Sequence, residues 1–81
     1  MLFCLDVGNS QTFGGVFDGQ KLLFTFRRTG SSRASSDESG IFFRTVLREN
    51  GVDPAAVDQV AICSVVPDAV HSLRNCFLKY F

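Results

Sequence analysis

Residues 6–12 carry, within one short stretch, the groups needed to hold a phosphate and a metal ion. Asp6 follows the apolar run at 2–5, which is too short for a typical helix and predicts a buried strand ending in a carboxylate. The next residues are small and turn-prone, so backbone N–H groups, an amide and the hydroxyls of Ser10 and Thr12 are expected to face one space. A carboxylate beside such donors is the hard oxygen ligand that Mg²⁺ uses when it arrives with phosphates. The stretch therefore predicts a turn suited to a metal–nucleotide complex.

A turn that binds nothing explains the same residues. Asp, Gly and Asn favour tight turns without any ligand, and the pattern Asp-x-Gly-x-Ser/Thr is short. Taken alone, the stretch therefore leaves both interpretations open.

The composition indicates one small domain. A chain of 81 residues buries only a modest fraction of its surface, but nine phenylalanines point to a real core. Eight basic residues balance eight acidic ones, so no net field attracts nucleic acid or an acidic membrane. The apolar runs are too short to span a bilayer, and the amino terminus lacks the pattern of a secretory signal. We expect a cytoplasmic protein that binds neither nucleic acid nor membrane.

The three cysteines show no metal-binding or disulfide pattern. Cys4, Cys63 and Cys76 have no CxxC spacing, and their odd number does not suggest a disulfide framework. Cys4 and Cys63 lie in apolar runs that predict strands, so we expect both to be buried as small hydrophobes. Cys76 lies on a predicted helix and its environment stays open.

A meander of three antiparallel strands is predicted first. The segment 12–17 ends at the Asp-Gly pair 18–19, which is a strong hairpin signal, and a third strand covers 22–26. The glycine pair 14–15 predicts a bulge, or a place where a ligand or another backbone approaches closely. The polar stretch 27–34, with three arginines, is either a phosphate or carboxylate clamp or, as we favour, a solvated loop.

A long helix is predicted next, with Ser35 or Ser36 as its N-cap and two acidic residues in its first turn. It runs to residue 50 and stops at Gly51, and its apolar residues at 42, 43, 46 and 47 form a stripe that can cover a sheet. Gly40 lies inside this helix and should cost about 1 kcal/mol relative to Ala, unless close packing requires it.

The remaining segment predicts a short turn capped by Asp53, a strand within 57–66 and a last helix that begins at Asp68. The nearly continuous apolar run in the strand is typical of a parallel strand covered on both faces. A strand, helix and strand in this order imply a crossover that lays the fourth strand parallel to an earlier one. Ser64 lies at its carboxyl end, where ligands bind in open α/β sheets.

This α/β order, β-β-β-α-β-α, resembles the first half-domain of the actin-like ATPase and sugar-kinase superfamily, which has an RNase-H-like fold. Five features narrow the resemblance to the amino-terminal part of a type III pantothenate kinase, also described as the Bvg accessory factor family. They are the opening residues 1–12, the turn at 17–19, Arg27 after the third strand, the helix entry at 36–38 and the segment 64–67. The resemblance covers essentially all 81 residues.

The resemblance implies ATP-dependent phosphorylation of pantothenate, the first step of coenzyme A biosynthesis, by a homodimer that uses Mg²⁺ and a monovalent cation, K⁺ or NH₄⁺. It implies that Asp6 acts on Mg²⁺ through water. Contacts to phosphate would come from Gly8, Asn9 and Ser10, where Ser10 replaces a more usual Thr and keeps the hydroxyl. The implied ATP-binding loop consists of Asp6, Val7, Gly8, Asn9, Ser10, Gln11, Thr12 and Phe13.

Length is the main departure from this family, whose members are much longer and close the nucleotide cleft with a second half-domain. The resemblance places the general base, the main pantothenate-contacting segment and the monovalent-cation site beyond Phe81, so no catalytic residue is assigned here. Phosphoryl transfer needs charge stabilisation from both sides of the transferring group, so we expect residues 1–81 to form one half-domain that is inactive alone. The alternative is a non-catalytic module that binds nucleotide or pairs with another subunit.

Overall fold

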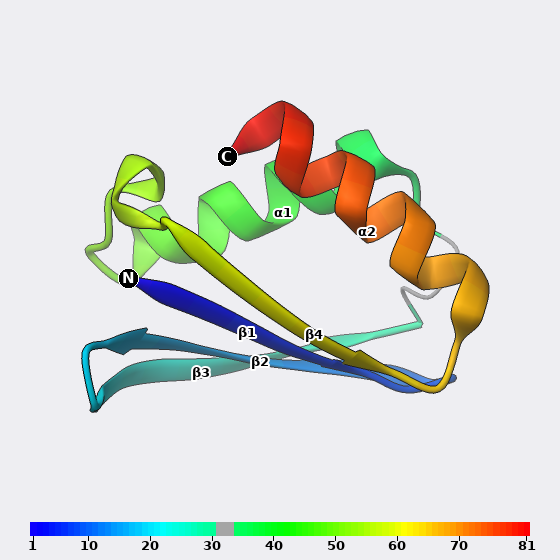
Figure 1. The fold of residues 1–81 in the computed structure, drawn as a ribbon, viewed down its shortest axis with the longest axis horizontal. Helices are drawn as coiled ribbons and strands as arrows, with labels where there is room; N and C mark the ends of the chain where they lie inside the picture. The colour runs from blue at the N-terminus through cyan, green and yellow to red at the C-terminus, as the bar shows by residue number, and fades with distance from the viewer. Residues whose placement is uncertain (31–33) are drawn as a thin grey trace.

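The computed structural model describes residues 1–30 and 34–81, and within them the chain forms one mixed four-stranded sheet and two α-helices (Figure 1). The sheet order is β3-β2-β1-β4, in which β4 is parallel to β1 and the other neighbours are antiparallel. Both helices lie on the same face of the sheet (Figure 1). The elements are β1 (Leu2–Val7), β2 (Gln11–Asp18), β3 (Lys21–Thr29), α1 (Ser36–Glu49), a 3₁₀ turn (Pro54–Ala56), β4 (Gln59–Ser64) and α2 (Pro67–Tyr80). The predicted α/β order is therefore confirmed.

Burial alternates along β1 and shows which face of the sheet is covered. Phe3, Leu5 and Val7 are at most 3% exposed because they point toward the helices. Asp6 is exposed and Cys4 is half-buried, since no element in the described part of the chain covers the opposite face. We call this opposite side the open face.

The core between sheet and helices is a cluster of phenylalanine rings centred on Phe3, which is fully buried. Its ring centroid lies 5.2–5.7 Å from those of Phe26, Phe43 and Phe77, and 6.1 Å from that of Phe81. Tilted and edge-to-face pairs at these distances are favourable beyond the burial of area alone. Most of the phenylalanines thus belong to one aromatic core.

Gly14 is needed by this core, and no register shift occurs at it. A Cβ on Gly14 would collide with the ring of Phe26, which lies directly against the strand. The register shift between β2 and β3 occurs instead between Val16 and Phe17. The predicted close approach is real, but an aromatic side chain makes it.

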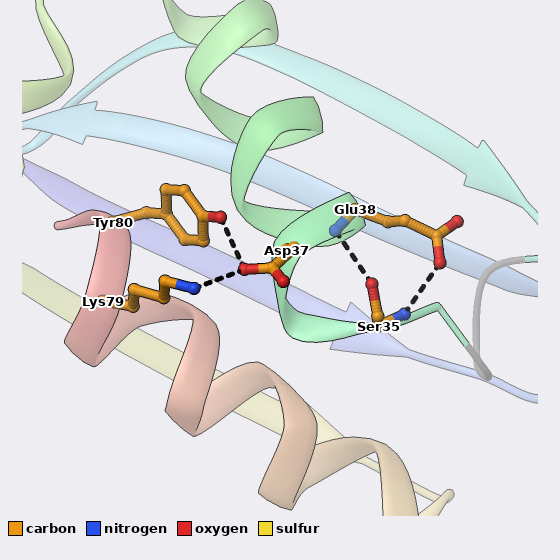
Figure 2. A network of polar contacts seen from close by, with 5 residues as sticks. All are labelled: Ser35, Asp37, Glu38, Lys79 and Tyr80. Carbon is orange, nitrogen blue, oxygen red and sulfur yellow. Dashed lines mark hydrogen bonds and ion pairs between the residues drawn. The ribbon is translucent and has the colours of Figure 1, made fainter.

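The start of α1 is fixed by a capping box. Glu38 donates its backbone N–H to Ser35 Oγ at 3.1 Å, and the Ser35 N–H donates to Glu38 Oε1 at 3.3 Å (Figure 2). Two amides that would otherwise lack helical partners are thereby satisfied. Ser35 is therefore the N-cap, and the helix ends before Gly51, which has φ 77°.

Gly40 lets α1 and α2 approach each other closely. A Cβ at this position would overlap the ring of Tyr80, and the Tyr80 carbonyl accepts a hydrogen bond of 2.9 Å from Arg44 Nη1. The glycine expected to weaken the helix is thus required by packing.

Gly40→Ala is expected to lower the free energy of unfolding by up to about 2 kcal/mol, because the cost of overpacking, about 1–3 kcal/mol, exceeds the gain in helix propensity of about 1 kcal/mol. Urea denaturation measures this change. Tyr80→Ala made in the Gly40→Ala background should recover part of the loss, and Glu49→Ala, at an exposed position of the same helix, serves as the control. An unchanged or raised midpoint for Gly40→Ala would contradict the packing role.

Asp37, in the first turn of α1, binds the last turn of α2. Its Oδ1 accepts a hydrogen bond of 2.8 Å from Lys79 Nζ and one of 2.6 Å from the Tyr80 hydroxyl (Figure 2). The Lys79 hydrogen bond, followed by that of Tyr80, holds the pKa of Asp37 below its ordinary value of 3.8. A pKa depressed in the folded state adds stability above the unfolded-state pKa, and this stability is lost as the pH falls through the folded-state pKa.

Asp37→Asn is therefore expected to lower the thermal midpoint at neutral pH and to have little effect well below pH 3.8, where the wild-type carboxylate is also neutral. Thermal scans across this range measure the difference. Glu49→Gln, which removes an exposed carboxylate at the other end of α1, should show no such convergence. A difference for Asp37→Asn that is equal at all pH values would contradict the assignment.

β4 and the cysteines differ from expectation. β4 is an edge strand, and Cys63, which pairs with Asp6 on the open face, is exposed. Val60 pairs with Phe3 on the helix side and is 37% exposed at the edge of the sheet. The predictions of a strand covered on both faces and of a buried Cys63 were wrong, because both described helices lie on the other face. Cys4 is only half-buried. Cys76 is buried in α2, and burial raises the pKa of its thiol to about 11, so it packs as a neutral group.

Neither helix in the described residues is long and apolar enough to cross a membrane.

Candidate functional site

The loop between β1 and β2 is a tight turn. The Gly8 N–H donates to the Gln11 carbonyl at 2.8 Å, which leaves Asn9 and Ser10 as the tip. A Cβ on Gly8 would lie 3.2 Å from the Gln11 oxygen, so a side chain there would press against the turn. Gly8 therefore shapes the loop, and its amide is already used within the protein.

Ser10 offers donors at the tip of this loop. It is exposed, and its carbonyl accepts a hydrogen bond of 2.9 Å from the Gly30 N–H, which ties the end of β3 to the loop. Within residues 1–30 and 34–81, its backbone N–H and its hydroxyl have no hydrogen-bond partner. Both groups can therefore donate to a bound anion.

The predicted site residues divide between the two faces of the sheet. Asp6 and its β2 neighbour Phe13 are exposed on the open face, whereas the paired Val7 and Thr12 are 1% and 5% exposed and point toward the helices. Thr12 is therefore buried, whereas Ser10 is exposed at the tip of the loop. That the hydroxyls of Ser10 and Thr12 face one space stays a prediction.

Thr12 lines a small polar cavity beneath the loop. The cavity measures about 10 Å³, room for one water molecule, and lies between the sheet and both helices. Arg28 closes one side of it: Nη1 donates to Ser39 Oγ at 3.2 Å, and the guanidinium lies 4.6 Å from the Phe42 ring centroid. Burial lowers the pKa of Arg28. Arg28 thus links β3 to α1 through its side chain and does not lie on the open face.

Four residues form a row across the open face near the loop. In the sheet register Asp6 lies opposite Cys63 on one side and Phe13 on the other, and Phe13 lies opposite Arg27. The Arg27 guanidinium lies 5.4 Å from the Phe13 ring centroid, and Phe13 is 42% exposed. A shallow apolar hollow of about 240 Å³ adjoins Asp6 and Phe13 on this face. The row thus places a carboxylate and a guanidinium on either side of an aromatic ring.

The arginine-rich stretch is only partly a loop. β3 continues to Thr29, so Arg27 and Arg28 belong to the strand, contrary to the expected loop beginning at 27. Arg33 lies outside the described residues. The third strand is longer than predicted because backbone pairing with β2 extends to Gln11 opposite Thr29.

The carboxylate of Asp6 suits a metal ion that arrives with its own ligands. The described residues contain no group of three or more His, Cys, Asp or Glu side chains that could cage a metal. Mg²⁺ needs no such cage, since it is commonly held by one or two carboxylates, waters and substrate phosphates. Asp6, one residue before the end of β1, and the Ser10 donors at the tip of the next turn are chemically suited to a Mg²⁺–phosphate complex of this kind.

A sequence model of the type III pantothenate kinase family matches residues 2–81. The chain belongs to this family. Type III pantothenate kinases from Legionella pneumophila (strain Corby) and Elusimicrobium minutum are 52% and 50% identical to it over 81 and 80 residues. The enzyme of that name from Agathobacter rectalis is 43% identical over 81 residues. These alignments cover 99–100% of this chain.

The chain spans about a third of the length of these type III pantothenate kinases, 31% of each. Family membership is therefore shown for residues 2–81. The remaining two thirds of these relatives have no counterpart in the 81 residues.

The sequence analysis did not predict that Arg27 and Arg28 lie on opposite faces of the sheet. The signal was present, because Phe24, Phe26 and Arg28 alternate with Arg27 and fall on the helix-covered face if the strand continues. Ending the strand at residue 26 concealed this alternation, and with it the position of Arg27 in the row.

Proposed function

We propose that this chain supplies the nucleotide-phosphate loop of a type III pantothenate kinase, which phosphorylates pantothenate with ATP in the first step of coenzyme A biosynthesis. The observation that carries the proposal is the exposed Asp6 carboxylate near the end of β1, followed within one tight turn by the exposed donors of Ser10, in a chain that matches this family. A carboxylate for a metal and N–H and O–H donors for phosphate are the two halves of a Mg²⁺–nucleotide site.

Residues 1–81 form, in this proposal, one RNase-H-like half-domain of the actin-like type. The mixed sheet β3-β2-β1-β4 with both helices on one face supports it. A second half-domain closes the nucleotide cleft in the complete enzyme, which we expect to be a cytoplasmic homodimer. Because transfer requires charge stabilisation from both sides of the phosphoryl group, the 81-residue chain alone does not turn over.

The residues of the loop have different roles. Asp6 holds Mg²⁺ through water, Ser10 donates to a phosphate oxygen, and Gly8 makes the turn between them. When bound, Mg²⁺ neutralises charge on the phosphate oxygens. Val7 and Thr12 support the loop from the buried side, while Asn9, Gln11 and Phe13 form its exposed rim. The general base and the K⁺ or NH₄⁺ site remain predictions for the rest of the enzyme.

A non-catalytic module is the second candidate. The open face and the β4 edge expose apolar side chains, among them Leu22 at 48% and Val60 at 37%, which suits pairing with another polypeptide. Such a module would bind nucleotide or a subunit without turnover.

Two measurements test these candidates. Mg-ATP added to the 81-residue chain should shift the amide resonances of residues 8–12, and Asp6→Ala or Ser10→Ala should abolish the shifts. A chimaera in which this chain replaces the matching 31% of the Legionella pneumophila enzyme should form phosphopantothenate. Binding without turnover by the chimaera would favour the module, and shifts confined to other residues would remove the loop assignment.

A further inference from the structure

The two arginines that end β3 lie on opposite faces of the sheet. Arg28 points to the helices, where Ser39 and the Phe42 ring bind it. Arg27 points to the open face and is exposed. Among the described residues, its side chain contacts the Phe13 ring and has no carboxylate within ion-pair distance. The fold therefore accounts for Arg28 and leaves Arg27 facing the same space as Asp6.

The register sets how far apart the backbones of Asp6 and Arg27 lie. Both residues are in register with Phe13, so their backbones are separated by two strand spacings, about 10 Å. Their side chains leave the sheet on the same side and flank the exposed Phe13 ring. If Asp6 holds a metal ion, an anion bound to that ion would lie on the same face of the sheet as the Arg27 guanidinium.

Two contacts hold Arg27 in this position. The Phe13 ring lies 5.4 Å from the guanidinium carbon, and such a cation–π contact restricts a side chain that would otherwise be highly mobile. The hydrogen bond from the Gly30 N–H to the Ser10 carbonyl joins the end of β3 to the loop tip. The Arg27 guanidinium is thus placed over Phe13, and the strand that carries it is joined to the loop three residues further on.

We propose that Arg27 is an anion-binding residue of this site and donates its planar N–H fork to an oxyanion of a reactant. The inference rests on the proposed function of the loop. The ligand chemistry is a phosphate or carboxylate group, since both accept two parallel hydrogen bonds from a guanidinium. A phosphate would come from the nucleotide and a carboxylate from pantothenate, and kinetics with each reactant varied in turn distinguishes the two sources.

The test compares Arg27→Gln, Arg27→Lys and Arg48→Gln in the Legionella chimaera, where Arg48 is an exposed arginine on α1. Arg27→Gln is expected to raise the KM for one reactant by about ten- to a hundredfold, the loss expected for a hydrogen-bonded charge contact. A raised KM for ATP identifies phosphate, and a raised KM for pantothenate identifies the carboxylate. Arg27→Lys should keep part of the affinity, and Arg48→Gln should match the unsubstituted chimaera.

If Arg27→Gln changes the KM values for ATP and pantothenate no more than Arg48→Gln does, the proposal is overturned. The proposed kinase function would be unaffected by that result. An inactive unsubstituted chimaera would instead count against the proposed function. In that case the Arg27 Nε resonance of the 81-residue chain tests the inference. It should shift when Mg-ATP or pantothenate is added. A resonance that shifts with neither Mg-ATP nor pantothenate would overturn the inference.

Discussion

Asp6→Asn is expected to lower kcat/KM of the chimaera by at least about a hundredfold, since removal even of a group in the outer shell of a metal costs ten- to a hundredfold. The substitution keeps the size of the side chain and removes the charge that Mg²⁺ requires. Asp6 is exposed and pairs through its backbone alone with Phe13 and Cys63, so the fold should survive. Activity measured over a range of Mg²⁺ concentrations should show weaker Mg²⁺ binding, so that the variant needs a higher Mg²⁺ concentration for half-maximal activity at every ATP concentration.

Asp18→Asn is the matched control for this substitution. Asp18 is an exposed carboxylate that ends β2 at the opposite end of the sheet, beside the Gly19 turn. It should leave kcat/KM unchanged, while thermal midpoints of both variants stay close to that of the unsubstituted protein. Equal activity of Asp6→Asn and Asp18→Asn would remove Asp6 from the metal site and with it the proposed role of the loop.

Phe3→Ala is expected to cause the largest loss of stability among single substitutions in the core. Phe3 is fully buried and its ring contacts those of Phe26, Phe43, Phe77 and Phe81, so truncation opens a cavity between sheet and both helices. Phe→Ala changes in cores cost about 3–5 kcal/mol. A domain of this size has a total stability of about 4–12 kcal/mol, so the loss is a large fraction of the whole. Far-UV circular dichroism during urea titration measures the change.

Phe13→Ala is the control because it makes the same truncation on the other face of the same sheet. Phe13 is 42% exposed on the open face and is absent from the phenylalanine core. Its loss should change the free energy of unfolding by less than about 1 kcal/mol, as is usual away from the core. Similar costs for Phe3→Ala and Phe13→Ala would show that the aromatic cluster does not carry the stability of the fold.

Local signals in the sequence were sufficient for the order and type of the elements. The Asp-Gly pair at 18–19 forms the β2–β3 turn with Gly19 at φ 61°, and Gly51 follows the end of α1 at φ 77°. The residues around Asp53 and Pro54 form the expected capped turn. These elements are fixed by steric limits on φ and by hydrogen bonds between residues close in sequence, which a single sequence displays directly.

The lengths of the elements and the burial of single residues were harder to predict from the sequence. Whether β3 continues past Phe26 depends on β2 offering partners, and whether Cys63 is buried depends on what covers β4. In α2 the buried residues are Ala69, Leu73 and Cys76, and Phe77 packs against the core beside them. The contact with α1, where Gly40 admits Tyr80, sets the rotation of that helix.

By itself, the sequence determined that a carboxylate, a glycine and hydroxyl-bearing residues meet in one turn, because these residues are adjacent in the chain. Only the tertiary structure decided which of them share a face. Pairing across three strands placed Asp6 with Arg27 on the open face, and Thr12 with Arg28 beneath the helices. Strand register is set by long-range backbone hydrogen bonds and by which face the aromatic core buries, and a shift of one residue would exchange these two sets.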